Sequence, residues 1–166
     1  MKKHIIAYLI KIILFLSLIL GAFIISRNYF QFALIQGNSM EPAYHSMELV
    51  IINKYDTRYH YDDTVAFFSD GVDSTLVKRI VALPNDTIEI RDHKLYINDI
   101  LYTSDDCRYD SIDYAGIANN EITLASDTYF VLGDNLSESK DSRYPSIGCI
   151  HTHDIIGKVY PIFPIH

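Results

Sequence analysis

The chain has 166 residues, of which 49% are hydrophobic, 14 are Lys or Arg and 21 are Asp or Glu. That length accommodates one compact domain together with a membrane anchor. Three of the basic residues precede residue 27, so residues 27–166 carry 11 basic side chains against all 21 acidic ones, a balance of about −10. A surface of that sign disfavours nucleic acid as a partner and gives no overall attraction to anionic lipids.

The first element is an apolar run at residues 5–25 that contains a single charged residue, Lys11. About 20 apolar residues span a bilayer, so the run is long enough to cross one. A cleaved signal peptide is the alternative, but its apolar core is shorter and a small-x-small site follows it. We therefore predict an uncleaved transmembrane anchor at residues 5–26. Lys2 and Lys3 precede it and predict that residues 1–4 are cytoplasmic and residues 27–166 extracytoplasmic.

Short strand patterns dominate the exported part. The predicted strands cover residues 48–53, 63–68, 74–83, 87–91, 94–98, 128–132 and 155–163. Two of them alternate cleanly around Asp92–His93, which predicts a hairpin. Many short strands with almost no helical periodicity predict an all-β domain of antiparallel sheets. Residues 99–127 are polar and irregular, and we expect a variable insertion there.

Two cysteines and a pair of histidines are candidates for other chemistry. Cys107 and Cys149 could form a disulfide in an exported domain, or could remain two small thiols. Neither has the spacing of a metal site. His151 and His153 share one face of a strand, but no further ligand pattern accompanies them. We interpret both as surface residues near a strand end.

Three segments carry the candidate chemistry: Gly-Asn-Ser-Met-Glu-Pro at 37–42, the apolar strand containing Lys78-Arg79, and residues 133–143. A serine hydroxyl becomes a good nucleophile only when a base takes its proton. A lysine can be that base when apolar surroundings lower its pKa, and no acidic residue lies within three positions of Lys78. Arg79 should face the other way, and we expect it in a structural ion pair.

Taken in this order, the three segments resemble those of the bacterial type I signal peptidases, which are membrane-bound Ser/Lys endopeptidases. The resemblance covers nearly the whole chain, and the short length with one anchor is similar to the Gram-positive branch. It implies that Ser39 is the nucleophile and Lys78 the general base, without a metal or an organic cofactor. It also implies that Ser139 hydrogen-bonds the lysine amine. Asp141 and Arg143 are then expected to shape the site as a salt bridge behind it.

The resemblance also implies a substrate class, the exported preproteins, cut after small residues at the first and third positions before the scissile bond. An extended peptide adding to strands would present alternate side chains to shallow pockets. By position, Ile35, Met40 and Val77 should line the inner pocket, although ordinary core residues would show the same pattern. The side chains of Phe30, Phe32 and Leu34 should touch the surface of the bilayer, which is the second expected partner.

Several positions depart from the family pattern. Gly37 stands where some members have a serine that donates the second hydrogen bond to the oxyanion, so that donor is unassigned. Asp62 and Asn85 replace glycines, Asp92–His93 replaces a hairpin often made with glycine, and Leu136 replaces a common arginine. These departures indicate a divergent member.

Two other functions compete with an active peptidase. A non-proteolytic relative that assists the assembly of surface structures such as pili lacks the Ser/Lys dyad, whereas this chain has both residues. A self-cleaving repressor has the dyad but needs a cytoplasmic DNA-binding part, whereas this chain has an anchor and no basic helix-turn-helix pattern. We therefore predict an active, membrane-bound signal peptidase.

Overall fold

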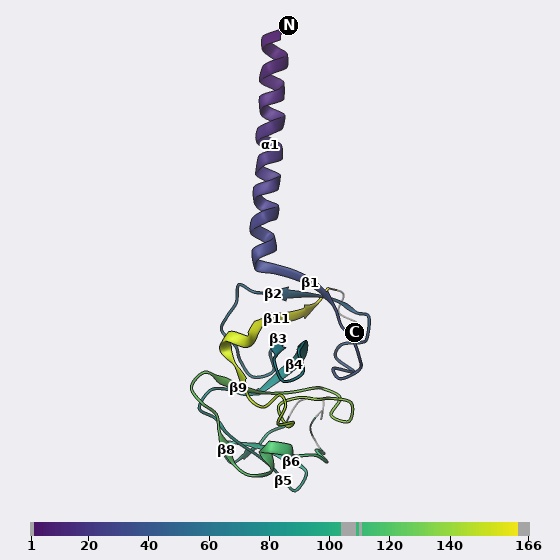
Figure 1. The fold of residues 1–166 in the computed structure, drawn as a ribbon, viewed down its shortest axis with the longest axis vertical. Coiled ribbons are helices and arrows are strands. Elements are labelled where there is room, and N and C mark those ends of the chain that lie inside the picture. The colour runs from purple at the N-terminus through teal and green to yellow at the C-terminus, as the bar shows by residue number, and fades with distance from the viewer. Residues whose placement is uncertain (1, 104–108, 110, 163–166) are drawn as a thin grey trace.

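A long helix stands on a domain built of strands (Figure 1). The structure, a computed structural model, describes residues 2–103, 109 and 111–162. Helix α1 (Lys2–Tyr29) is 28 residues long, which corresponds to about 42 Å at 1.5 Å per residue. Its apolar segment Tyr8–Tyr29 is long enough to cross a bilayer, and its most apolar stretch is not buried. This segment ends three residues beyond the predicted anchor.

The described strands form two antiparallel sheets. The larger sheet has the order β1-β2-β11-β3-β4-β9-β10, and the smaller sheet has the order β7-β6-β5-β8. The larger sheet consists of β1 (Phe30–Leu34), β2 (Leu49–Asn53), β11 (Ile155–Pro161), β3 (Thr64–Ser69), β4 (Ser74–Ala82), β9 (Thr128–Leu132) and β10 (Ile150–His151). The smaller sheet consists of β7 (Ile100–Leu101), β6 (Lys94–Ile97), β5 (Thr87–Arg91) and β8 (Ile122–Thr123). Two short 3-10 helices, η1 (Gly116–Asn119) and η2 (Thr152–Asp154), complete the described elements.

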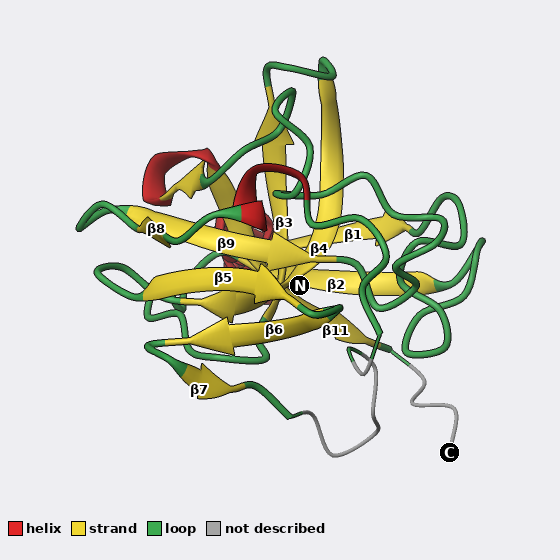
Figure 2. Ribbon diagram, turned by 90° about the horizontal axis from the view of Figure 1, so that it is seen from below, coloured by secondary structure: helices red, strands yellow, loops and turns green. Residues whose placement is uncertain are grey.

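The two sheets lie at different distances from the anchor. β1 and β2 lie directly below α1, whereas β5, β6 and β8 lie at the far end of the domain (Figure 1). Figure 2 shows β5, β6 and β7 side by side, viewed from that far end. The larger sheet therefore joins the anchor to the rest of the domain.

The prediction of an all-β domain with one N-terminal apolar helix is confirmed. All seven predicted strands are present, as β2, β3, β4, β5, β6, β9 and β11, with ends that differ by at most about two residues. β1, β7, β8 and β10 were not predicted. Three of these are only two residues long, which is too short for an alternating pattern. β1 begins at the residue after α1, so no loop marks the boundary between helix and strand.

Residues 99–127 contain β7, η1 and β8. Four side chains of this stretch are buried in the core cluster beside the smaller sheet: Tyr109, Ile112, Ala118 and Leu124. The described part of the stretch is therefore packed into the domain, and the variability of the stretch stays a prediction.

At three turns where the sequence replaces glycine, four residues lie in the left-handed region of φ. Asp62 has φ 67°, Asn85 has φ 70°, and Asp92 and His93 have φ 50° and 63°. Asn and Asp tolerate this conformation because their short polar side chains bond locally. The turns are thus kept although glycine is replaced at each.

Candidate active site

Two residues that are 39 positions apart in the sequence meet in the structure. The Lys78 Nζ donates a hydrogen bond to Ser39 Oγ over 2.7 Å and another to the Val77 carbonyl over 2.9 Å. Lys78 lies in β4, where it is paired with Val65 of β3. The predicted pair is therefore within the distance that direct proton transfer requires.

The turn that carries Ser39 is held from two sides. On one side, Met40 and Ile35 are buried in a core cluster with residues of β2, β3 and β11. On the other side, the Asn135 N–H donates to the Ser39 carbonyl over 3.0 Å. The backbone of the nucleophile is therefore fixed between the core and the loop after β9.

Burial sets the charge of Lys78. The residue is 3% exposed, and burial lowers the pKa of its amine from 10.5 to about 8, although Asp141 and Asp134 oppose the shift. At pH 7 roughly one amine in ten is then neutral, against roughly one in a few thousand for an ordinary lysine. The two carboxylates that oppose the shift belong to the 133–143 segment, which is distant in the sequence. The sequence therefore showed only that no acidic residue lies near Lys78 within its own strand.

The Ser139 hydroxyl does not make the expected hydrogen bond. It is buried beside Gly133 and has no hydrogen-bond partner among the described residues. A Cβ built on Gly133 would collide with this hydroxyl and lie 2.5 Å from the Ser39 carbonyl oxygen. Ser139 therefore packs next to the nucleophile's turn, and its bond to the lysine amine is absent in this geometry. A role for Ser139 in the reaction stays a prediction.

Asp141 and Arg143 form the expected salt bridge. Arg143 Nε lies 2.8 Å from Asp141 Oδ1, and both side chains are buried. The Gly133 N–H donates to Asp141 Oδ2 over 3.1 Å, and Arg143 also donates to the carbonyls of Leu136 and Ser139. The pair thus ties the two ends of the 133–143 segment together behind Lys78.

Arg79 forms the ion pair that was expected of it. Its Nε and NH2 donate to the two carboxylate oxygens of Asp134, over 2.8 and 2.6 Å. Its NH1 donates to the Asp62 carbonyl over 2.7 Å. The sequence did not reveal Asp134 as the partner of Arg79, because the two residues are 55 positions apart.

A groove of about 330 Å³ leads to the Ser39–Lys78 pair. One wall is the β1 end with residues 33–36, and the other is the start of β4 at residues 74–78. The three predicted pocket residues, Ile35, Met40 and Val77, all line this groove. Whether they contact a substrate stays a prediction.

The groove offers a backbone donor beside the nucleophile. Within the described part of the chain, the Ser39 N–H donates to no acceptor, so it is available to a developing oxyanion. Gly37 has φ 83°, a conformation that disfavours a side chain at this position. A serine at position 37 would have a strained backbone, which gives a physical reason why a serine donor is missing there.

The other sequence candidates lie away from the groove. His151 and His153 are surface residues as predicted, with their rings stacked 5.2 Å apart. They do not share a strand, because β10 ends at His151 and His153 lies in η2. The Cys149 thiol is free and half-buried, and burial raises its pKa, while Cys107 lies outside the described residues. In the described ranges, no three His, Cys, Asp or Glu side chains are grouped to hold a metal.

A serine hydroxyl against a buried lysine amine is the arrangement of the serine hydrolases in which lysine replaces histidine as the base. The family model described as "Signal peptidase, peptidase S26" matches residues 6–163, and the chain belongs to this family. As a member of this family, the chain is a serine endopeptidase. The family and the apolar helix together fit a single-pass membrane protein.

Individual relatives agree with the family match. Signal peptidase I U of Bacillus subtilis (strain 168) is 30% identical, over 93% of this chain and 88% of its own length. Signal peptidase IB of Staphylococcus aureus (strain COL) is 32% identical, over 96% and 89%. A crystal structure of a signal peptidase I from Enterococcus faecalis V583 is 30% identical with a TM-score of 0.51, over 62% of this chain and 97% of that one. These matches do not favour the non-proteolytic alternative.

Proposed function

We propose that this chain removes signal peptides from exported preproteins, with Ser39 as the nucleophile and Lys78 as its general base. The observation that carries the assignment is the 2.7 Å contact between Ser39 Oγ and the buried Lys78 Nζ. In the protonated form the amine donates to the hydroxyl. In the neutral form, the same contact lets the hydroxyl donate its proton to the amine lone pair.

The reaction then follows from the positions of these two groups. The neutral Lys78 amine takes the Ser39 proton while Oγ attacks the scissile carbonyl carbon, and the oxyanion faces the Ser39 N–H. The Lys78 ammonium gives that proton to the departing amine nitrogen, and the C–N bond breaks to leave an ester on Ser39. Water attacks the ester carbon and loses a proton to neutral Lys78. The bond between this carbon and Oγ then breaks, Lys78 returns the proton to Oγ, and the signal peptide is released with a new carboxylate.

The shape of the groove supports a preference for small residues before the cut. An extended peptide between residues 33–36 and 74–78 would pair with both strand segments and point alternate side chains toward the floor. Ile35, Met40 and Val77 narrow that floor next to Ser39. Small residues at the first and third positions before the cut would fit, and larger ones would clash.

The anchor sets where the reaction takes place. Lys2 and Lys3 keep the N-terminus in the cytoplasm, so residues 27–166 and the groove are extracytoplasmic. The exposed side chains of Phe30, Phe32 and Leu34 on β1 then face the bilayer surface. A preprotein whose signal segment is still embedded would present its cleavage site at this level.

The test uses the detergent-solubilised full chain and a preprotein with alanine at both specificity positions. Ser39→Ala and Lys78→Ala should each abolish the processed product, detected by gel and by mass of the new N-terminus. Ser137→Ala and Lys94→Ala make the same changes at exposed positions and should cleave normally. Cleavage by a folded Ser39→Ala or Lys78→Ala variant would refute the assignment.

A further inference from the structure

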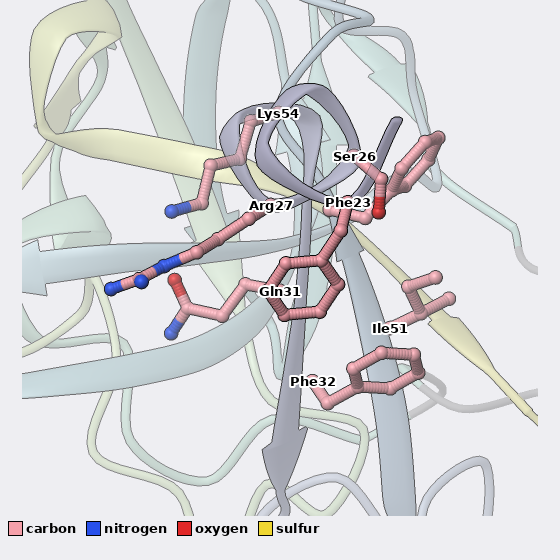
Figure 3. Close-up of a pocket in the computed structure, with 8 residues that line it drawn as sticks. Phe23, Ser26, Arg27, Gln31, Phe32, Ile51 and Lys54 are labelled. Atoms are coloured by element: carbon pink, nitrogen blue, oxygen red, sulfur yellow. The ribbon is translucent and has the colours of Figure 1, made fainter. Parts of the chain in front are cut away.

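A second hollow, of about 670 Å³, lies where α1 meets the sheet (Figure 3). It shares only Gln31 with the groove at Ser39. Its lining comes from the end of α1 (Phe23, Ser26, Arg27), from β1 (Phe30, Gln31, Phe32) and from β2 and the residue after it (Ile51, Lys54). The proteolytic mechanism uses none of these side chains.

Polar and apolar groups occupy opposite sides of this hollow. The polar ends of Arg27, Lys54 and Gln31 extend to the same side, whereas Phe32 and Ile51 lie on the other (Figure 3). The hollow therefore offers two cations and an amide next to an aromatic and aliphatic wall. That combination suits a ligand with an anionic group attached to a hydrocarbon chain.

Contacts between the end of α1 and the residues after β2 fix the positions of Arg27 and Lys54. The Lys54 N–H donates to the Tyr29 carbonyl at the end of α1 over 2.8 Å. The rings of Tyr29 and Tyr55 meet edge to face, with centroids 5.5 Å apart. Arg27 belongs to the last turn of the same helix. The spacing between the cations is therefore built into the junction of helix and sheet.

Neither cation is paired with a carboxylate among the described residues. By contrast, the buried cations Arg79, Arg143 and Lys158 each have at least one carboxylate partner. Residues 27–166 are strongly acidic, so two adjacent unpaired cations oppose the sign of the rest of the domain. An anion in this hollow would be attracted by the two cations, although the domain as a whole is negatively charged.

The position of the hollow selects the kind of anion. The membrane-crossing segment of α1 ends at Tyr29, so the residues around Arg27 and Lys54 lie at the level of the lipid headgroups. Phe32, on the opposite wall of the hollow, is 66% exposed, and such exposure of a phenyl ring to water is unfavourable. In the bilayer, the phosphate and acyl chain of a lipid would meet these cations and this ring together.

We propose that this hollow binds one anionic phospholipid, with its phosphate between Arg27 and Lys54 and an acyl chain against Phe23, Phe32 and Ile51. Each basic residue close to an anionic lipid surface is worth about a fivefold gain in binding, so two give a preference of about 25-fold over a lipid without net charge. The proposal is independent of the chemistry at Ser39.

A signal peptide is a poorer occupant of this hollow. Its basic residues precede the apolar core, and the segment next to the cut consists of small neutral residues. Two cations find no partner in such a peptide. The apolar wall alone would accept it, so the experiment includes this occupant as a competing outcome.

The test measures which lipid lies next to the hollow. The chain has no tryptophan, so Tyr55→Trp introduces a single fluorophore beside Lys54. The full chain is reconstituted in phosphatidylcholine bilayers that contain a small, equal fraction of brominated phosphatidylglycerol or brominated phosphatidylcholine. The brominated anionic lipid should quench the fluorophore with a relative binding constant about 25-fold higher. Arg27→Gln combined with Lys54→Gln should reduce that preference to about one.

A matched control separates the hollow from general surface charge. Lys94→Gln with Lys140→Gln removes two exposed cations outside the hollow and should leave the preference unchanged. Equal quenching by the two lipids, or an unchanged preference in the Arg27/Lys54 variant, would overturn the proposal. Relief of quenching by a synthetic signal peptide, equal for both lipids, would also overturn it and assign the hollow to the substrate.

Discussion

Replacing Lys78 by methionine should abolish cleavage and also stabilise the fold at neutral pH. The amine is 3% exposed, and its pKa falls from 10.5 to about 8 on folding. Such a shift corresponds to a cost of about 3 kcal/mol for keeping the protonated amine in the fold. Methionine has a similar length without the charge, so the variant avoids that cost.

The pH dependence of this effect has a definite sign. Below pH 8 the amine is protonated in both folded and unfolded chains, and the full cost is present. Between pH 8 and 10.5 the unfolded chain binds a proton that the folded chain has lost, so the stability of the unmodified protein rises with pH. Its free energy of unfolding should therefore approach that of Lys78→Met, and the gap should shrink from about 3 kcal/mol at pH 7 to about 1 kcal/mol at pH 9.5.

The measurement is urea unfolding of the detergent-solubilised full chain, followed by pulse proteolysis at both pH values. Lys158→Met is a matched control because Lys158 is 4% exposed but forms ion pairs with Asp56 and Asp63, over 3.0 and 2.8 Å. These partners raise the pKa of Lys158, so its loss should destabilise the fold equally at pH 7 and 9.5. A stability gap for Lys78→Met that does not change with pH would show that its amine keeps an ordinary pKa, and the general-base argument would fail.

Three further outcomes are expected. Asp141→Asn removes a carboxylate that raises the pKa of Lys78, so the rise of kcat/KM with pH should move to lower pH, and a move to higher pH would contradict this expectation. The same substitution breaks the pair with Arg143, which should cost about 3–5 kcal/mol of unfolding free energy. Gly133→Ala puts a Cβ against the Ser39 carbonyl and should lower kcat about 100-fold in the preprotein assay, whereas unchanged kcat would show that the turn can move. Asn85→Ala should destabilise the fold by about 1 kcal/mol in thermal unfolding because φ is 70°, while Asn85→Gly should not, and equal losses would point to the side chain rather than to φ.

Local patterns in the sequence predicted most of the strands and the central pair. Alternation of apolar residues locates β5 and β6, and apolar runs between turn residues locate β2, β3 and β9. Ser39 and Lys78 could be assigned because two short motifs carry them. The distance between the two groups follows from the pairing of strands and becomes known only with the fold.

Contacts between distant segments could not be predicted in the same way. The bond between Ser139 and the lysine was expected from the family pattern, but the hydroxyl packs against Gly133 instead. The Arg79–Asp134 pair joins a strand to a loop 55 positions later. The net charge of residues 27–166 hides the proximity of Arg27 and Lys54, because a sum over the chain does not record which charges are neighbours.

The absence of a linker between α1 and β1 has a consequence for the geometry of cleavage. The helix ends at Tyr29, the strand begins at Phe30, and β1 runs across the helix axis (Figure 1). Its five residues cover about 17 Å, so the chain moves sideways along the membrane before it reaches the nucleophile. A helix is about 10–12 Å wide, and this offset leaves room for a second one beside the anchor. In the proposed function, this corner between α1 and β1 would place Ser39 to one side of the anchor, where the membrane segment of a preprotein would lie.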